Sequence, residues 1–391
     1  MRRAVAAVAA LLATAALSAC AIPPPGAPGA PLTPVGFSQL PGWPEAKPAT
    51  VLRAFVQSCA ALAQLPPRQD VGGSGEVATR AGLAGQWTRV CTEANALKVG
   101  DEAAAHAFFE RNFQPYALGS GLVTGYYEPE VQGSLRPGGD YTVPLLRLPP
   151  DLVRASLGDF DPALKGHSVT GHVVGGKLVP YYDRSEIEDG VLDGENLALL
   201  WLRSPVDAYF LQIQGSGRVV LPDGRMVRVT YAGQNGRTYV AIGRTLTARG
   251  AIPGGQATMQ SIRAWLLAHP LQARALMDEN PSYVFFREID GLPPQDGPPG
   301  TLGASLTPRR SVAVDPRTVP LGAPIWLATT DPVTGKPMQR MVVAQDTGGA
   351  ITGQGRIDLF FGWGEAAREA AGRMQAQGRS FVLLPLARPA T

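Results

Sequence analysis

Residues that build metal centres are scarce in this sequence, which has only three cysteines and four histidines among its 391 residues. No histidine lies at zinc-ligand spacing from a pair of cysteines, so the sequence indicates no metal site, and it indicates no organic cofactor either. The formal net charge of +3 is also small. Because a nucleic-acid-binding protein usually concentrates basic residues on one face, we predict no nucleic-acid partner.

Long apolar runs are missing as well, and the most apolar stretch is too short to span a bilayer comfortably. It covers residues 4–17 and follows Arg2 and Arg3, an arrangement that suits a secretory signal peptide. The hydrophobic share of 45% and the charged share of 17% are ordinary for a soluble globular protein. The sequence therefore predicts an exported protein with a globular body.

The end of this stretch, residues 17–20 (LSAC), resembles the lipobox of bacterial lipoproteins. The resemblance implies that residues 1–19 are removed and that the thiol of Cys20 is acylated, which would anchor the protein durably. Ala21 follows instead of aspartate, and in enteric-type sorting this indicates the outer membrane. We therefore predict a periplasmic protein held by outer-membrane lipid through Cys20. A plain signal peptide with a coincidental cysteine is the alternative.

The other two cysteines, Cys59 and Cys91, allow two interpretations. An oxidising periplasm permits a disulfide between them. Both also lie on the apolar faces of predicted helices, where a free cysteine packs as a small hydrophobic residue. The sequence leaves the choice between these open.

Residues 20–50 form the predicted lipid anchor and a tether, because their many prolines favour extended chain that cannot bury a core. From Val51 onward, apolar residues recur at steps of three and four, which predicts helices. These helices cover about residues 51–62, 87–97 and 101–112. We expect them to pack as a lead-in to the main domain.

The 46 glycines and 36 prolines favour a β-rich body of short strands and turns. The turn at residues 222–224 makes residues 217–231 a hairpin, because proline presets φ and glycine accepts positive φ. Helical patterns return at residues 257–278, interrupted by Pro270, and at residues 365–374. Strands are predicted at residues 121–127, 141–148, 177–182, 208–214, 217–221, 225–231, 283–288, 311–314, 324–328, 339–345, 356–360 and 380–386.

Three aspartates near the C-terminus lie in strand-and-turn settings: Asp315, Asp346 and Asp358. Alternation along a strand places Asp358 opposite its apolar neighbours and on the same face as Phe360. A carboxylate in apolar company loses solvation, which favours its neutral form and raises its pKa. A general acid for glycosidic cleavage needs such a raised pKa near neutral pH.

Each aspartate also has a structural interpretation. Asp315 precedes Pro316 and is typical of the start of a turn. Asp346 precedes Thr-Gly-Gly and could cap that turn. Asp358 could pair with Arg356 or cap a neighbouring backbone segment.

Several motifs, taken together with these aspartates, carry a resemblance to a known family. They are residues 124–129 (TGYYEP), 210–217 (FLQIQGSG), 280–286 (NPSYVFF), 303–311 (GASLTPRRS) and the lipobox. In this order they resemble the membrane-bound lytic murein transglycosylase A (MltA) family, with its C-terminal 3D domain named for three aspartates. The resemblance covers about residues 51–388.

The resemblance implies a mainly β fold with flanking helices. Residues 51–129 and 281–388 would form a double-psi β-barrel catalytic domain. Residues 130–280 would form an inserted second β domain, with a groove between the two. The predicted hairpin lies within this insert.

The resemblance also assigns site residues. Asp358 matches the family's catalytic aspartate, and Asp346 matches a neighbouring, supporting position. The expected substrate-binding residues are Thr124, Tyr126, Tyr127, Gln214, Gly215, Ser216, Gly348 and Gly349. Tyr126 and Tyr127 could instead serve strand packing, and residues 214–216 could be a strand-ending turn.

Two arginines and one segment of the middle region have alternatives as well. Arg184 and Arg309 could meet acidic peptide stems or remain solvated on the surface. Residues 181–185 could begin a helix, with Ser185 and Glu188 as its capping box.

The implied activity is cleavage of peptidoglycan glycan strands by a lytic exotransglycosylase, a lyase acting on polysaccharides, although the residues themselves do not separate exo from endo action. The β-1,4 bond between N-acetylmuramic acid and N-acetylglucosamine would break and leave a 1,6-anhydromuramoyl end. Peptidoglycan synthases are candidate protein partners. The alternatives are a glycoside hydrolase on the same barrel, with Asp346 as its second carboxylate, and a non-catalytic peptidoglycan-binding lipoprotein.

Overall fold

The computed structural model describes residues 32–164 and 167–386. The predicted signal peptide and Cys20 lie outside these residues. Within them, no helix combines the length and the apolar character that a membrane crossing requires.

Six strands of the described chain close into a barrel. They follow one another around it as β2 (Phe113–Glu128), β15 (Ile357–Trp363), β12 (Ser311–Ala313), β14 (Pro337–Asp346), β13 (Pro324–Thr330) and β16 (Gln375–Pro385). β16 pairs again with β2 and completes the circle. The β2–β15 and β12–β14 contacts are parallel and the others are antiparallel. The predicted mainly β fold built on a barrel is confirmed.

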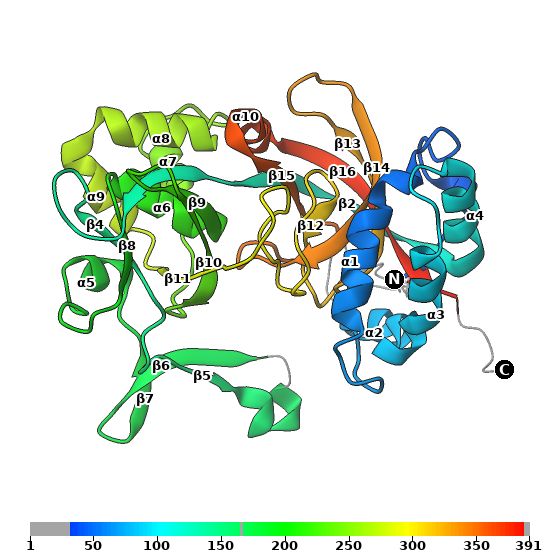
Figure 1. Cartoon of the computed structure of the whole chain (residues 1–391), viewed down its shortest axis with the longest axis horizontal. Helices are drawn as coiled ribbons and strands as arrows, with labels where there is room; N and C mark the ends of the chain where they lie inside the picture. Colours follow the sequence, from blue (N-terminus) through cyan, green and yellow to red (C-terminus); the bar gives the residue numbers. More distant parts are fainter. Residues whose placement is uncertain (1–31, 165–166, 387–391) are drawn as a thin grey trace, which may run out of the picture.

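Helices cover the barrel on one side, as Figure 1 shows in blue and cyan. They are α1 (Leu52–Leu62), α2 (Glu76–Ala81), α3 (Ala84–Asn95) and α4 (Glu102–Asn112), close to the predicted ranges apart from the short α2. Cys59 of α1 and Cys91 of α3 form a disulfide, with an S–S distance of 2.10 Å. The open question about these cysteines is thus answered in favour of the bond.

Residues 32–50 pack on the barrel, contrary to the expectation of an extended tether. The strand β1 (Thr33–Pro34) pairs with β2. Leu40 and Trp43 are buried. The indole of Trp43 donates a 2.7 Å hydrogen bond to Glu110 and lies edge-on to Trp326. The prediction overlooked these apolar side chains among the prolines, which gain free energy by leaving water.

The chain between β2 and the later barrel strands forms a second lobe, the inserted lobe. This lobe contains a six-stranded sheet. Its strand order is β11 (Val284–Glu288), β10 (Met226–Gln234), β9 (Ser216–Val220), β3 (Glu130–Ser134), β8 (Ala198–Leu202) and β4 (Val143–Leu146). The predicted hairpin is β9–β10, with Val220 opposite Met226. Because β11 pairs with β10, the insert continues to Glu288 and not to the predicted residue 280.

One predicted strand of this lobe is wrong. Residues 208–214 belong to the helix α6 (Pro205–Gln214). Ser204 caps its first turn, Pro205 occupies the first helical position, and Gly215 ends it with a left-handed φ of 76°. Because α6 is buried on nearly all sides, its apolar residues show no helical periodicity. Only the cap residues in the sequence indicated a helix here.

Three more helices, α7 (Ile242–Ala248), α8 (Met259–Ala268) and α9 (Pro270–Asp278), complete the helical layer of this lobe. The break between α8 and α9 lies at His269, directly before Pro270, as predicted. The helix α5 (Arg184–Glu188) is also present, but Asp183 and Glu186 form its capping box in place of the predicted Ser185 and Glu188.

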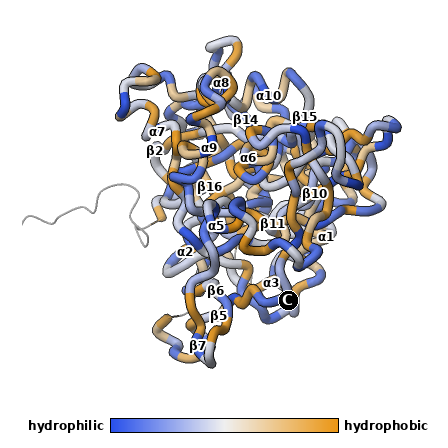
Figure 2. The backbone as a smooth tube through the Cα atoms, turned by 90° about the vertical axis from the view of Figure 1, so that its left-hand side faces the viewer, coloured by the Kyte–Doolittle hydropathy of each residue, from blue (hydrophilic) through white to orange (hydrophobic). Residues whose placement is uncertain are grey.

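A small sheet projects from the inserted lobe, at the bottom of Figure 1. It consists of β5 (Val153–Ser156), β6 (Ser168–Val174) and β7 (Lys177–Pro180). Figure 2 shows orange, apolar stretches on this projection as well as in the body of the protein. Val173 and Val174 near its tip are exposed.

Candidate active site

Asp358 lies on β15, directly beside β2. Strand pairing places it opposite Thr124, and the hydroxyl of Thr124 donates a 2.7 Å hydrogen bond to Oδ1 of Asp358. Ile357 and Leu359 point into the barrel core, whereas Phe360 belongs to a separate apolar cluster with Tyr126. Asp358 therefore shares the outward face of β15 with Phe360, as the alternation predicted.

Burial raises the pKa of Asp358 to about 6, against an ordinary value of 3.8. The hydrogen bond from Thr124 and the charge of Arg356 oppose this rise in pKa, and the charge of Asp346 adds to it. Arg356 donates to the backbone oxygens of Leu122 and Ile357. No basic side chain of residues 32–164 and 167–386 forms an ion pair with the Asp358 carboxylate within 4.0 Å. The alternative of a structural ion pair with Arg356 is thus not realised.

Asp346 ends β14 and has its oxygens occupied by neighbouring protein groups. Oδ2 accepts a 2.9 Å hydrogen bond from the hydroxyl of Tyr126. Oδ1 accepts from the backbone and hydroxyl of Thr301 and from the backbone of Thr347, at 2.9–3.0 Å. Burial raises the pKa of Asp346, and these hydrogen bonds counteract that rise. A carboxylate held this way is suited to fix neighbouring groups in place.

The two carboxylates are connected through one strand. Thr124 binds Asp358 and Tyr126 binds Asp346, and both side chains project from the same face of β2. Gly125 between them lets the helix α10 (Gly364–Arg373) approach, because an added Cβ would lie 2.9 Å from Cα of Ala371. The Tyr126 ring also packs on Phe360, with centroids 5.2 Å apart. The motif at 124–126 therefore organises both aspartates.

The other expected binding residues are distributed differently. The side chain of Tyr127 packs in the barrel's apolar cluster, and its backbone N–H donates a 2.9 Å hydrogen bond to Oε1 of Gln214. Gln214 thus joins the inserted lobe to β2. Gly215 caps α6, and Ser216 is buried at the start of β9.

The glycines after Asp346 form the expected turn. Gly348 accepts a 2.8 Å backbone hydrogen bond from Ile351, and Gly349 is exposed. A Cβ at Gly349 would meet nothing within 4 Å, so the fold does not require glycine there. This leaves an open approach to the Gly349 backbone.

Asp315 has the structural role that its sequence setting indicated. It is 2% exposed and binds the guanidinium of Arg317 and the backbone N–H of Gly353. Although burial disfavours its charged form, these hydrogen bonds hold the pKa of Asp315 below its ordinary value.

Of the two arginines considered for peptide stems, Arg184 departs from both interpretations, whereas the side chain of Arg309 is 40% exposed and agrees with the surface interpretation. Arg184 is 1% exposed and bonds to Glu188 and Gln212 inside the inserted lobe, so it is neither solvated nor available to a stem. Arg309 adopts a left-handed φ of 58° and pairs with Asp331.

A buried charge cluster at the end of β2 escaped the sequence analysis. Glu128 is fully buried and binds Arg218 at 2.9 Å and Arg228 at 2.7 Å. The guanidinium of Arg218 also lies 4.1 Å above the ring of Trp363. The sequence did contain a signal for this cluster. The predicted hairpin places Arg218 directly opposite Arg228, and two facing cations require an anion between them.

Thr301 is a second residue that the sequence analysis missed. It lies in the proline-rich loop before β12 and binds Asp346 through both its backbone and its hydroxyl. Gly300 allows the loop to cross β14, since a Cβ there would lie 2.4 Å from the backbone oxygen of Gln345. Nothing in the sequence marked this contact.

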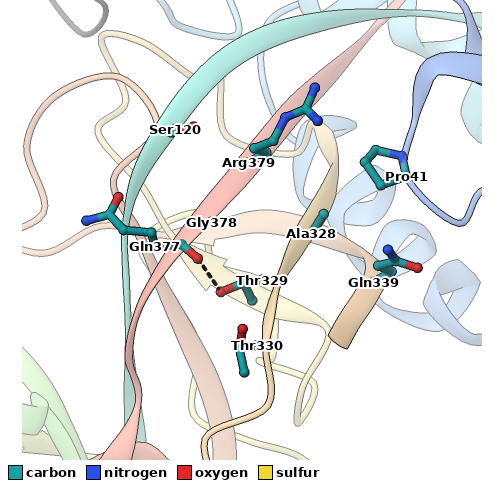
Figure 3. A pocket seen from close by; sticks show the side chains of 9 residues that line it. All are labelled: Pro41, Ser120, Ala328, Thr329, Thr330, Gln339, Gln377, Gly378 and Arg379. Atoms are coloured by element: carbon teal, nitrogen blue, oxygen red, sulfur yellow. Dashed lines mark hydrogen bonds between the residues drawn. The ribbon is translucent and has the colours of Figure 1, made fainter. Parts of the chain in front are cut away.

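Neither Asp358 nor Asp346 lines either of two cavities found on the described residues. Figure 3 shows one of about 350 Å³, lined mainly by residues of β2, β13, β14 and β16, where Thr329 donates a hydrogen bond to the backbone oxygen of Gln377. The other, of about 590 Å³, lies at α6–α8 and includes Gln214 and Gln375. The described chain also holds no group of three histidine, cysteine, aspartate or glutamate side chains fit for a metal ion.

Comparison with family models gives two matches. Residues 122–287 match the MltA specific insert domain, and residues 310–384 match the 3D domain. The first range covers the strands of the inserted lobe except for the last residue of β11, and the second covers β12 to β15 and all but the last residue of β16.

Among relatives, membrane-bound lytic murein transglycosylase A of Vibrio cholerae is 31% identical over 300 residues, which is 73% of this chain and 72% of that protein. The protein of the same name from Escherichia coli K12 is 32% identical over 66% of this chain and 64% of its own length. The alignment therefore spans about two thirds of each relative.

The chain is also similar to solved structures. A membrane-bound lytic murein transglycosylase from Agrobacterium tumefaciens is 32% identical with a TM-score of 0.79, covering 90% of this chain and 97% of that one. MltA from Neisseria gonorrhoeae is 33% identical with a TM-score of 0.73, covering 92% and 94%. E. coli MltA with bound chitohexaose is 25% identical with a TM-score of 0.68, covering 93% and 96%.

Proposed function

The chain belongs to the membrane-bound lytic murein transglycosylase A family, and from this premise we propose that Asp358 is its single catalytic acid and base. The reaction is cleavage of the β-1,4 bond between N-acetylmuramic acid and N-acetylglucosamine in peptidoglycan, with a 1,6-anhydromuramoyl product. The observation that carries the proposal is a carboxyl group with a pKa of about 6, held by Thr124 and free of an ion pair within the described residues.

In the first step the protonated Asp358 donates its proton to the oxygen that links the two sugars. The bond from that oxygen to C1 of the muramoyl ring breaks, and the ring takes on oxocarbenium character. A pKa near 6 keeps part of the enzyme protonated close to neutral pH, where an ordinary aspartate would have lost its proton.

In the second step the Asp358 carboxylate removes a proton from the C6 hydroxyl of the same ring. The C6 oxygen bonds to C1, so the proton returns to Asp358 and no water is consumed. Because the attacking hydroxyl belongs to the substrate itself, the step avoids a bimolecular encounter, an advantage of about 7–11 kcal/mol in well-oriented cases. The Thr124 hydroxyl stabilises the carboxylate between the two proton transfers.

Asp346 has a supporting role in this scheme. Its oxygens already accept hydrogen bonds from Tyr126, Thr301 and Thr347. Its charge raises the pKa of Asp358, after the larger effect of burial. It therefore contributes to the acidity of the catalytic group without touching the sugar.

A hydrolase on the same barrel is the second candidate, and it would need Asp346 as nucleophile or base. The occupied oxygens of Asp346 argue against that role. The two reactions differ in product mass, since an anhydro product is one water lighter than a reducing end.

The decisive experiment is digestion of purified sacculi, with mass analysis of the soluble products. We expect anhydro-muropeptides from the wild type and a loss of at least a hundredfold in rate for Asp358→Asn, which keeps the size and removes the acid. Asp223→Asn, in the exposed turn of the β9–β10 hairpin, is the matched control. Near-wild-type release of anhydro products by Asp358→Asn would refute the assignment, and products with reducing ends would establish the hydrolase.

The cellular setting follows from the leader. We propose an anchor on Cys20 in the outer membrane, with peptidoglycan synthases as candidate partners. Cys20→Ala should release the protein from the membrane fraction without changing the activity of the purified enzyme. Membrane retention of that variant would contradict the anchor.

A further inference from the structure

The larger cavity, of about 590 Å³, lies between helices of the inserted lobe and one residue of the barrel. Phe210, Ile213, Ile242 and Ile262 supply apolar walls from α6, α7 and α8, and Gln375 at the start of β16 closes the barrel side. The cavity is therefore an apolar recess at the junction of the two lobes.

The cavity borders the proposed reaction site. Gln375 stands opposite Thr124 in the β16–β2 pairing, and Thr124 stands opposite Asp358 in the β2–β15 pairing. Side chains in register on neighbouring strands project from the same face. Two strand spacings of about 4.8 Å place the Cα atoms of Gln375 and Asp358 about 10 Å apart.

The charged side chains that line the cavity are positive only. The described residues that line it include Arg244 but no aspartate or glutamate. Arg244 is exposed and, in the part of the chain that the structure describes, has no carboxylate within 4.0 Å. By contrast, Arg249 one turn further on is paired with Glu279. An apolar recess with an uncompensated cation favours a ligand that carries both apolar groups and a carboxylate.

We propose that this cavity binds the peptide stem of the muramoyl residue at the reaction site, with Arg244 pairing with a stem carboxylate. The inference rests on the proposed function and names a second part of the same substrate. A glycan strand with amide-linked stems has no carboxylate in its sugar backbone, whereas the stem carries alanine methyl groups and free carboxylates. Extended peptide advances about 3.3–3.6 Å per residue, so about three residues span the 10 Å from the reaction site.

The consequence is selectivity between substrates. A strand with stems gains contacts that a stripped strand lacks, and those contacts lie away from the reacting bond. They should therefore tighten binding of the substrate more than they accelerate the chemical step.

The test measures binding, so that it does not depend on turnover. Short glycan strands with intact stems are compared with the same strands after amidase treatment, by titration calorimetry against the Asp358→Asn protein. We expect the stem-bearing strands to bind at least fivefold more tightly. Adding Arg244→Ala should reduce this affinity ratio to about one, and Arg244→Lys should keep most of it. Arg225→Ala, an exposed arginine outside the cavity, should leave the ratio as it is.

Equal affinity for both strand types in the parent protein would overturn the proposal, as would an equal loss of affinity for both on Arg244→Ala. Either result leaves the proposed function standing, because that is decided by the mass of the products from sacculi. Conversely, if the wild-type enzyme released no anhydro products, the proposed function would be refuted. The affinity ratio would still test whether the cavity binds the stem.

Discussion

Thr124 donates a 2.7 Å hydrogen bond to Asp358 across 234 positions of sequence, from β2 to β15. This hydrogen bond lowers the pKa of Asp358, because a donor to a carboxylate stabilises its charged form. Burial favours the neutral acid, and the pKa of about 6 is the balance of these opposing effects. The activity of the site should therefore respond to both members of this pair.

Removal of the hydroxyl is the first change to make. In Thr124→Val the carboxylate loses a hydrogen bond to a charged group, an interaction of about 1.5–3 kcal/mol. The pKa of Asp358 should rise by about one to two units, since one unit corresponds to about 1.4 kcal/mol. The pH–rate profile should shift upward by that amount, and its maximum rate should fall because the carboxylate is a poorer partner for the second step. Thr329→Val on β13, whose hydroxyl binds the backbone of Gln377 and not Asp358, is the matched control. An unshifted profile for Thr124→Val would show that the bond does not tune the acid.

The raised pKa also predicts a dependence of stability on pH. A carboxyl group whose pKa is higher in the folded than in the unfolded state binds protons more readily when folded. Its contribution is therefore fully present below about pH 4 and is lost as the pH rises through about 6. Asp358→Asn lacks this titration.

We expect Asp358→Asn to be more stable than the wild type by about 1–3 kcal/mol at pH 7.5 and equally stable near pH 3.5. Urea unfolding at a series of pH values measures the difference. A constant difference across this range would mean that the half-buried surroundings of Asp358 do not raise its pKa in the folded protein.

Much of this arrangement could be anticipated from sequence, including the β9–β10 hairpin, but the distant partners of the barrel strands could not. The alternation at residues 357–360 placed Asp358 on the outward face correctly, because the period of a strand is a local property. The pairing of Thr124 with Asp358 depends on barrel closure over most of the chain, which no local pattern encodes. Only the family resemblance brought the two segments together.

The errors have physical causes too. Residues 208–214 were expected to be a strand because α6 is buried on most sides and lacks a polar stripe, although Ser204, Pro205 and Gly215 bracket a helix. Leu40 and Trp43 bury themselves within a stretch whose prolines indicated extended chain. In both cases tertiary burial overrode the local pattern.

Tyr126 offers a test of the supporting role of Asp346. Tyr126→Phe keeps the ring on Phe360 and removes the hydroxyl that binds Asp346. We expect kcat to fall by about ten- to a hundredfold with little change in KM, because the substrate still binds while the acid is less well positioned. Steady-state kinetics on soluble glycan strands separates the two constants. Tyr231→Phe, on an exposed tyrosine, is the control. A rise in KM at constant kcat would place Tyr126 in substrate binding instead.

Glu128 should matter for folding more than for chemistry. Its carboxylate is the shared anion of Arg218 and Arg228, and all three side chains are at least nine-tenths buried. Glu128→Gln leaves two buried cations facing each other, and breaking a buried ion pair in this way typically destabilises a protein by about 3–5 kcal/mol. Glu76→Gln, which disrupts the exposed pair with Arg80, should change stability by no more than about 1 kcal/mol.

Chemical unfolding of both variants beside the wild type measures the two losses. Because Glu128 ends β2 and the arginines lie on β9 and β10, the pair joins the barrel to the inserted lobe. A loss confined to this junction should appear as separate unfolding of the two lobes in Glu128→Gln, whereas we expect the wild type to unfold in one transition. If Glu128→Gln lost no more stability than Glu76→Gln, the buried cluster would not be what holds the lobes together, and other contacts, such as those of Gln214 with β2 and of Gln260 with α10, would hold them.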